Sequence, residues 1–281
     1  MSNSVVDILL PCFNSEKFLN QQIDSIMAQT YPHWRLIIRD DGSSDNTLKI
    51  IESYIKTIPE KIVLISDNNT NLGTKKNIEI LLQSSTSKYI MFSDHDDIWL
   101  SNKIEISLNK MIETELNNPN YPILVHTDLQ VVSEDLSIIH KSFFEYTRTK
   151  PWFTKDLYYL ANHSCVTGCT MIINKLAQKM VLPIPDVALM HDFWFSLVVC
   201  QHGKIEHIAT PTVLYRQHTS NVLGAQKVDK IYFLKKFRNL KNIWTLNSNV
   251  IKTLKIINPK FSYIKWLTVK IQINFSKFFS K

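Results

Sequence analysis

The segment Tyr89-Ile90-Met91-Phe92-Ser93-Asp94-His95-Asp96-Asp97-Ile98-Trp99 places three carboxylates directly after four apolar residues. A short apolar run of this kind indicates a buried strand, and carboxylates at its end repel one another at a cost that burial increases. A hard divalent cation relieves this repulsion, because Mg²⁺ and Mn²⁺ prefer carboxylate oxygens as ligands. The alternative is a solvated turn in which an aspartate caps a helix, and Asp97 stands where it could cap one beginning near Ile98.

Apolar runs of the same kind precede this one, at 5–10, 34–38 and 62–65. The intervals between the runs have the apolar spacing of helices, at 15–29, 48–58 and 77–83. This alternation predicts an α/β fold with a mainly parallel sheet flanked by helices. Ligands of such sheets lie at the carboxyl ends of the strands. Because three polar segments (11–14, 40–45 and 94–97) each follow a predicted strand, we expect them to form one site.

Beyond Trp99 the pattern is less regular. It predicts helices at 104–116 and 193–200, strands at 123–126 and 203–214, and a hairpin at 130–139.

Four cysteines lie in or beside apolar segments without the paired spacing of a metal site, so we expect buried free thiols in a reducing compartment. The N-terminal residues lack the features of a signal peptide, and no run of about 18 apolar residues occurs. These features predict a cytoplasmic protein.

Charge divides the chain into two parts. Residues 226–281 carry 13 Lys+Arg and one acid, so this segment holds a formal charge of +12 and the rest of the chain −5. Apolar residues in 228–244 have helical spacing, whereas those in 269–275 alternate as in a strand. A basic, aromatic segment suits the surface of an anionic membrane. The alternatives are a helical appendage that packs on the rest of the chain or forms a homodimer. We expect no nucleic-acid binding, because no recognised motif accompanies the charge.

Seven segments, in this order and spacing, resemble the inverting family 2 glycosyltransferases of the GT-A fold. They are Leu10-Pro11-Cys12-Phe13-Asn14, residues 40–45 and 71–77, Asp94-His95-Asp96, Thr167-Gly168-Cys169, His191-Asp192-Phe193-Trp194 and residues 215–221. The resemblance covers roughly residues 5–224 and is strongest to the bacterial rhamnosyltransferase-type subgroup of surface-polysaccharide synthesis. Two positions differ from the common pattern, since His95 replaces a Gln and His191 replaces a Glu.

The resemblance implies a GT-A, Rossmann-like catalytic domain at 1–224, with a nucleotide-binding half at 1–97 and an acceptor-binding half at 98–224. A basic, mainly helical appendage at 225–281 would follow. The implied activity is inverting transfer of a sugar, rhamnose or a hexose, from a UDP- or dTDP-sugar donor to a glycan acceptor. A lipid-linked acceptor would place the enzyme at the cytoplasmic face of the inner membrane, in O-antigen, capsule or similar synthesis. A nucleotidyltransferase and a non-catalytic nucleotide-sugar-binding protein remain the alternatives.

The resemblance also implies roles for individual residues. Asp192 would be the general base, although an aspartate at this position can simply cap a helix. Asp94, Asp96 and His218 would hold Mn²⁺ or Mg²⁺, and Asp94 would also approach the ribose. The nucleotide would be bound by Pro11, Phe13, Asn14, Asp40, Asp41, Lys76 and Asp94. The acceptor would contact Thr167, Gly168, His191 and Trp194, and the diphosphate would contact Arg216 and Ser220. For Lys76 and Trp194 the alternatives are a solvated side chain and core packing.

Overall fold

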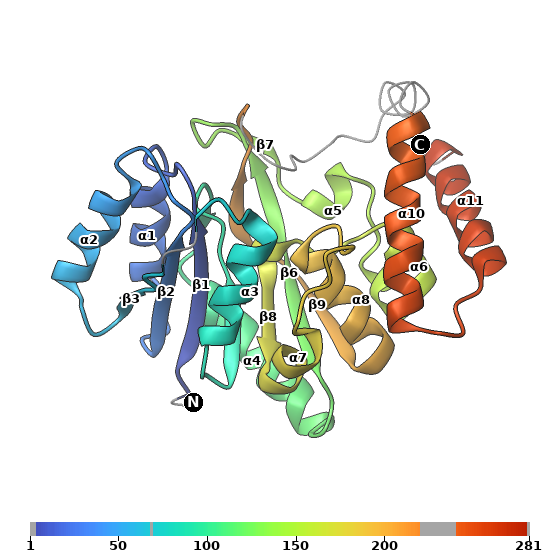
Figure 1. Ribbon diagram of the computed structural model, residues 1–281, viewed down its shortest axis with the longest axis horizontal. Helices are drawn as coiled ribbons and strands as arrows, with labels where there is room; N and C mark the ends of the chain where they lie inside the picture. Colours follow the sequence, from blue (N-terminus) through green and yellow to red (C-terminus); the bar gives the residue numbers. More distant parts are fainter. Residues whose placement is uncertain (1–3, 68–69, 220–239, 280–281) are drawn as a thin grey trace.

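Four parallel strands, all predicted from the sequence, form the first half of the sheet in the order β3-β2-β1-β4. This computed structural model describes residues 4–67, 70–219 and 240–279. The strands are β1 (Val6–Cys12), β2 (Trp34–Asp40), β3 (Ile62–Leu64) and β4 (Tyr89–Phe92). Helices α1 (Leu19–Met27), α2 (Thr47–Thr57) and α3 (Thr74–Ser84) connect them. In Figure 1 this half occupies the blue side of the molecule.

The sheet continues from β4 in the order β8-β6-β9-β5, and β7 pairs with β6 at its side. These strands are β5 (Ile98–Trp99), β6 (Ile123–Val132), β7 (Ile138–His140), β8 (Met171–Asn174) and β9 (Lys204–Arg216). Within the described residues, β8 runs antiparallel to both of its neighbours, and β5 and β7 run antiparallel to β9 and β6. The remaining pairs are parallel, so the predicted mainly parallel α/β sheet is confirmed.

The second half has more helices than the sequence pattern predicted. Two were predicted, α4 (Lys103–Asn117) and α8 (His191–His202). Three were not, α5 (Phe143–Tyr146), α6 (Leu157–Asn162) and α7 (Lys175–Val181), and 3₁₀ turns lie at η1 (Pro151–Lys155) and η2 (Gly168–Thr170). The unpredicted helices have four to seven residues, so they contain too few turns to show a helical period.

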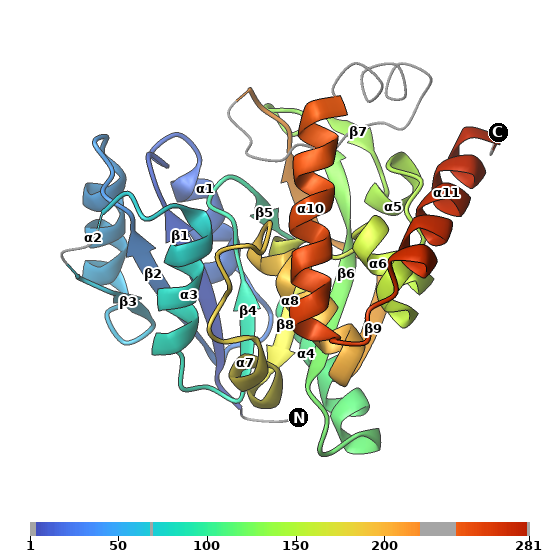
Figure 2. The same ribbon diagram turned by 45° about the vertical axis from the view of Figure 1, so that its right-hand side comes forward.

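Two hydrophobic cores lie on opposite faces of the sheet. Alternate residues of β1 explain the division, because Ile8 and Leu10 belong to one core and Leu9 to the other. The first of these cores contains the apolar faces of α1, α2 and α4, and the second contains those of α3, α7 and α8. Figure 2 shows α3, α7 and α8 on the near side of the sheet. The two layers hold the strand ends rigidly at one edge, where the polar segments meet.

Two further helices pack on the second core. They are α10 (Leu240–Ile257) and α11 (Tyr263–Phe279), and Figure 2 shows them beside α6 and α8. Leu254 of α10 and Trp266 of α11 are 0% and 2% exposed and belong to the same core cluster as Phe193. The predicted boundary at 224/225 lies outside the described residues.

Two local predictions were wrong. Residues 269–275, which alternate as in a strand, form part of α11. Val269 and Ile273 face the core while Ile271 and Phe275 are exposed, so apolar residues on both sides of a helix produced the alternation. No helix begins near Ile98, where β5 pairs with β9 instead.

Candidate active site

A cavity of about 610 Å³ opens at the carboxyl ends of β1, β2 and β4, where the sequence predicted a shared site. Asp94 and Asp96 reach it from the loop after β4, and Asp192 reaches it from the first turn of α8. The remaining predicted residues in its lining are Pro11, Phe13, Asp41, Thr167, Gly168 and His191. The fold therefore brings together, in one cavity, three acids that are separated by up to 98 positions in the chain.

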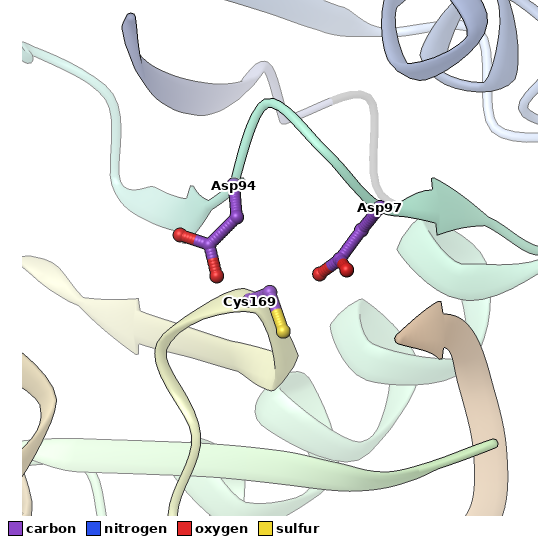
Figure 3. Close-up of side chains that lie close together, drawn as sticks. All are labelled: Asp94, Asp97 and Cys169. Atoms are coloured by element: carbon purple, nitrogen blue, oxygen red, sulfur yellow. The ribbon is translucent and has the colours of Figure 1, made fainter. Parts of the chain in front are cut away.

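The loop between β4 and β5 holds two aspartates on either side of the Cys169 thiol. Ligand atoms of Asp94, Asp97 and Cys169 lie within 4.8 Å of one another, and Figure 3 shows the two carboxylates pointing toward η2. One oxygen of Asp97 accepts a hydrogen bond from the Arg216 amide at 3.1 Å, while its Oδ2 is buried without a hydrogen-bond partner. This loop therefore concentrates negative charge in a region that water does not solvate well.

The electrostatics follow from that concentration. Burial, with the charges of Asp96 and Asp192, raises the pKa of Asp94 to about 7. Burial also raises the pKa of Asp97 well above its usual value, with Asp96 and Asp94 adding to the effect. Burial and the same two aspartates raise the pKa of the Cys169 thiol. The Cys169 thiol is therefore protonated at neutral pH and can donate its single hydrogen to one of the two carboxylates.

The residues predicted as metal ligands are suited to a hard cation. Asp96 Oδ2 lies 2.9 Å from His218 Nε2, so an acid and an imidazole from distant segments already meet. Carboxylate oxygen and neutral imidazole suit Mn²⁺, whereas a protonated thiol does not bind a hard ion. For this reason we do not count Cys169 as a ligand. In the structure Asp94 groups with Asp97, Asp96 pairs with His218, and the set of Asp94, Asp96 and His218 stays a prediction.

Asp192 lines the cavity beside Thr167, Gly168 and His191, which the sequence analysis predicted to contact the acceptor. Its Oδ2 accepts a hydrogen bond from the Gly168 amide at 3.2 Å, and its Oδ1 accepts one from the Phe193 amide at 2.7 Å. A Cβ at Gly168 would lie 2.8 Å from His191 Nε2, so this position accommodates no larger residue without movement. Burial lowers the pKa of His191, which keeps its ring neutral at the cavity wall. These contacts fix the direction of the Asp192 carboxylate.

The residues predicted to bind the nucleotide include Asn14, Asp40 and Asp41, in the loops after β1 and β2, of which Asp41 lines the cavity. Asp41 accepts hydrogen bonds from the amides of Leu72 (3.0 Å) and Gly73 (2.7 Å) and pairs with buried Arg39 at 3.0 Å. Asp40 lies one residue back and does not line the cavity, and its Oδ2 accepts from the Ser43 amide at 2.9 Å. Asn14 Oδ1 accepts from the Ser44 amide at 2.9 Å. These groups shape two adjoining loops at the ends of β1 and β2.

Among the predicted residues that do not line the cavity, two are occupied elsewhere. Lys76 is 55% exposed at its side chain and pairs with Glu79 at 2.9 Å, which is the solvated alternative. Trp194 is 6% exposed and its indole N–H donates to the Val181 carbonyl at 2.7 Å, so the structure places it in the core and not at the acceptor wall.

The predicted diphosphate contacts remain untested. The Arg216 guanidinium donates to Gln21 Oε1 at 2.6 Å, to the Glu134 carbonyl at 2.6 Å and to the Asp96 carbonyl at 2.8 Å. Its observed contacts therefore hold the loop after β4 against α1 and the β6–β7 turn. Ser220 lies outside the described residues.

The chain matches the sequence profile described as Glycosyl transferase family 2 over residues 7–179, which is more than half of its length. It belongs to this family. A described relative is the UDP-Glc:alpha-D-GlcNAc-diphosphoundecaprenol beta-1,3-glucosyltransferase WfgD of Escherichia coli, 31% identical over 252 residues that cover 87% of this chain and 85% of WfgD. The dTDP-rhamnosyl transferase RfbG of Shigella flexneri is 27% identical over 83% of this chain and 79% of RfbG.

One relative is a longer chain, and a solved structure shares the fold. An uncharacterized glycosyltransferase of Rickettsia prowazekii is 29% identical over 68% of this chain, and the match spans 58% of that protein's length. The fold is similar to that of S. aureus TarS 1–349 in complex with UDP, with a TM-score of 0.64 at 14% identity, over 98% of this chain and 72% of TarS 1–349. This likeness confirms the GT-A fold.

The glycosyltransferase cavity also contains residues to which the sequence analysis assigned no role. Phe143 and Tyr215 line it with their rings edge to face at 6.3 Å. The buried Asp128 carboxylate accepts the Phe143 amide at 3.0 Å and so positions that ring. Asn77, which belongs to a recognised segment, lines the cavity and has a buried Oδ1 with no hydrogen-bond partner. Tyr215 could have been predicted from the sequence, because it precedes Arg216 at the end of a strand. No feature of the sequence near Phe143 indicates that this residue lines the cavity.

Proposed function

We propose that the protein is an inverting, metal-dependent glycosyltransferase that moves a sugar from a UDP- or dTDP-sugar to a lipid-linked glycan in bacterial surface-polysaccharide synthesis. The observation that carries the proposal is the single cavity lined by Asp94, Asp96 and Asp192. The names of WfgD and RfbG, which specify UDP-glucose and dTDP-rhamnosyl donors, support the nucleotide range. The name of WfgD also supports an acceptor linked to a polyprenyl diphosphate.

A divalent cation fits the acidic end of this cavity. Burial, together with the charges of Asp96 and Asp192, raises the pKa of Asp94 to about 7, and a cation would offset the repulsion between these carboxylates. Asp94, Asp96 and His218 would hold Mn²⁺ or Mg²⁺, which when bound neutralises charge on the donor's diphosphate. Asp41 is our candidate for contact with the base, because it lines the cavity beside the loop at Leu72 and Gly73.

Asp192 is suited to activate the acceptor. Its carboxylate lines the cavity and is held by the Gly168 and Phe193 amides. We propose that it accepts the proton of the acceptor hydroxyl while that oxygen attacks C1 of the donor sugar. Attack from the face opposite the leaving diphosphate inverts the configuration at C1. Phe143 and Tyr215 present aromatic surface on which a sugar ring can pack.

We further propose that α11 contacts an anionic membrane. Ile264, Ile271 and Phe275 are 77%, 60% and 64% exposed on this helix, and Lys260 and Lys265 are exposed beside them. Apolar side chains among cations are the features of a helix that lies in a membrane interface. Among the described helices none has the length and apolar character needed to cross a bilayer.

The substitution Asp192→Asn tests the base directly. We expect Mn²⁺-dependent binding of UDP, measured by calorimetry, to stay within about twofold of wild type, while transfer to a synthetic GlcNAc-diphosphate lipid falls at least about 100-fold. Asp186→Asn is the matched control, because Asp186 is exposed in the preceding segment and does not line the cavity.

Two outcomes would contradict the proposal. Transfer by Asp192→Asn at a rate near wild type would exclude Asp192 as the base. Release of pyrophosphate from a nucleoside triphosphate in the presence of a sugar 1-phosphate, with no release of a nucleoside diphosphate from the nucleotide sugar, would favour a nucleotidyltransferase.

A further inference from the structure

A second cavity, of about 290 Å³, adjoins the first on its acceptor side. It lies between α6, α10, α11 and the start of α8, and Figure 2 shows these helices grouped together. Ser164, Leu189 and Phe193 line both cavities, so the two share a wall. Phe193 follows Asp192 directly in α8, which places the second cavity next to the proposed base.

The charge of this second cavity is opposite to that of the first. Its described lining contains the cation Lys270 and no carboxylate, together with amide side chains from three helices: Asn162, Asn247 and Asn274. Lys270 Nζ donates to Asn247 Oδ1 and lies 4.6 Å from the Trp266 ring centroid. Trp266, which also lines the cavity, is 2% exposed, and its indole N–H is buried without a hydrogen-bond partner. A cation, amides and an unused N–H donor suit an anionic group.

The helices around this cavity are anchored to the catalytic domain. Val250 of α10 and Ile273 of α11 are each 5% exposed and belong to the same core cluster as Phe193. The Asn162 side chain of α6 also donates to the Trp266 carbonyl at 3.1 Å. The cavity is therefore a built part of the fold, and the exposed apolar face of α11 lies on the same helix as Lys270.

We propose that the second cavity binds the phosphate of a lipid-linked acceptor while the acceptor sugar reaches Asp192 in the first. This inference rests on the proposed glycosyl transfer. The acids of the first cavity would repel an acceptor phosphate, because like charges at close range in a poorly solvated site are costly. The adjoining cavity supplies Lys270 and carries no acid in its described lining. Phosphate binding there places the sugar beside the base and leaves the lipid at the α11 surface.

Binding of farnesyl diphosphate to the full chain in EDTA tests the proposal. Without a divalent cation the acidic cavity repels a diphosphate, so the binding measured by calorimetry reports the second cavity. We expect saturable binding that Lys270→Gln weakens about tenfold, since a charge-assisted hydrogen bond is lost. Leu246→Trp, at a half-exposed position of the lining, should weaken binding by obstruction without removing charge.

Lys265→Gln is the matched control. Lys265 lies on the same helix, 56% exposed at its side chain and 3.8 Å from Asp156, and it does not line the cavity. Equal weakening by Lys265→Gln and Lys270→Gln would show diffuse surface charge and overturn the proposal, as would absence of saturable binding. A short-chain phosphatidylglycerol, added as monomers, tests whether the cavity instead binds the headgroup of a membrane lipid. Binding of this lipid as tight as that of farnesyl diphosphate would also overturn the proposal.

Failure of this inference can be separated from failure of the proposed function. Lys270→Gln should retain Mn²⁺-dependent UDP binding and hydrolysis of the donor in water, because both depend on the first cavity. The variant should raise the KM for the lipid-linked acceptor about tenfold with little change for a free sugar acceptor. A wild-type protein that neither binds UDP nor hydrolyses a donor would contradict the glycosyltransferase itself.

Discussion

Asp94 and Asp97 show how a cluster of acids can be kept at a strand end without unfolding the chain. The protonated Cys169 thiol lies within 4.8 Å of both carboxylates and can donate its single hydrogen to one of them, and the Arg216 amide donates to Asp97. These contacts stabilise the ionised carboxylates only in part, since burial still raises both pKa values. The residual strain is electrostatic, and a bound cation would relieve it.

Replacing Asp94 tests this electrostatic cost. The pKa of Asp94 is about 7 in the fold and 3.8 in a model compound, so the folded chain binds the extra proton between those values. Stability contributed by this group is therefore lost as pH rises from about 4 to about 7 and stays lost above. In EDTA we expect Asp94→Asn to be more stable than wild type by about 1–3 kcal/mol at pH 8, with the difference shrinking by pH 5. Urea denaturation at each pH measures it.

The cation supplies the control for this experiment. Mn²⁺ at pH 8 should stabilise wild type more than Asp94→Asn, because the variant has lost a charged ligand. If the free energies of unfolding of the two proteins change in parallel across this pH range, the ionised Asp94 carboxylate does not destabilise the fold. Buried histidines shift the absolute curves, since burial lowers the pKa of His95 and His191, but they are common to both proteins.

At the scale of elements, Lys75 links α3 to the segment that precedes α8. It lies in the first turn of α3, and its Nζ donates to the carbonyls of Asp186 at 2.6 Å and Ala188 at 2.9 Å. Those carbonyls belong to the segment that leads into α8 and Asp192. A single side chain therefore fixes the distance between the helix beside the nucleotide loops and the helix that carries the proposed base.

Substitution of Lys75 by Met should loosen this connection. We expect kcat for transfer to fall about tenfold through misplacement of Asp192, with UDP affinity nearly unchanged. Lys76→Met is the control, because Lys76 pairs with Glu79 on the surface and should leave both parameters within about twofold. Weakened UDP binding in Lys76→Met would instead support the nucleotide contact predicted from the sequence. Steady-state kinetics and calorimetry distinguish the two results.

At the scale of the whole molecule, the distribution of charge and apolar surface gives the protein an orientation. The acidic cavity lies at the strand ends, while the basic segment that includes α10 and α11 packs beyond α6 and α8, as Figure 1 shows. Because Leu254 and Trp266 are buried in the shared core, removing residues 226–281 would damage the fold. Point substitutions on the exposed face of α11 are therefore the sharper test of membrane contact.

We expect the double substitution Ile264→Asn and Ile271→Asn to reduce co-sedimentation with phosphatidylglycerol vesicles at least about fivefold, because apolar area is lost from the interface. Leu116→Asn is the control, since Leu116 in α4 is 77% exposed, as Ile264 is. Equal loss in both variants, or unchanged sedimentation of the double variant, would contradict the orientation. Phosphatidylcholine vesicles should bind weakly in every case, because the lysines have no anionic partner there.

The local sequence pattern was sufficient to predict much of the fold and part of the site. The apolar runs of β1, β2 and β4 marked buried strands, and their order placed Pro11, Asp41 and Asp94 at one edge before any contact was known. Two properties explain this success: a strand's burial depends on its own residues, and parallel strands end at the same edge. The expectation that Asp192 joins the same cavity rested on family resemblance, because no local rule connects residues so far apart.

The assignment of side chains to solvent, core or cavity came from contacts between distant segments. Lys75 and Lys76 are adjacent lysines with the same local surroundings, yet one binds carbonyls more than 100 positions away and the other faces water. Trp194 lies in the core because the Val181 carbonyl accepts its indole N–H, and α11 is a helix because the second core accepts one of its faces. Helix and strand propensity and apolar periodicity reflect local interactions. The placement of these side chains depends instead on which distant groups the completed fold brings into contact with them.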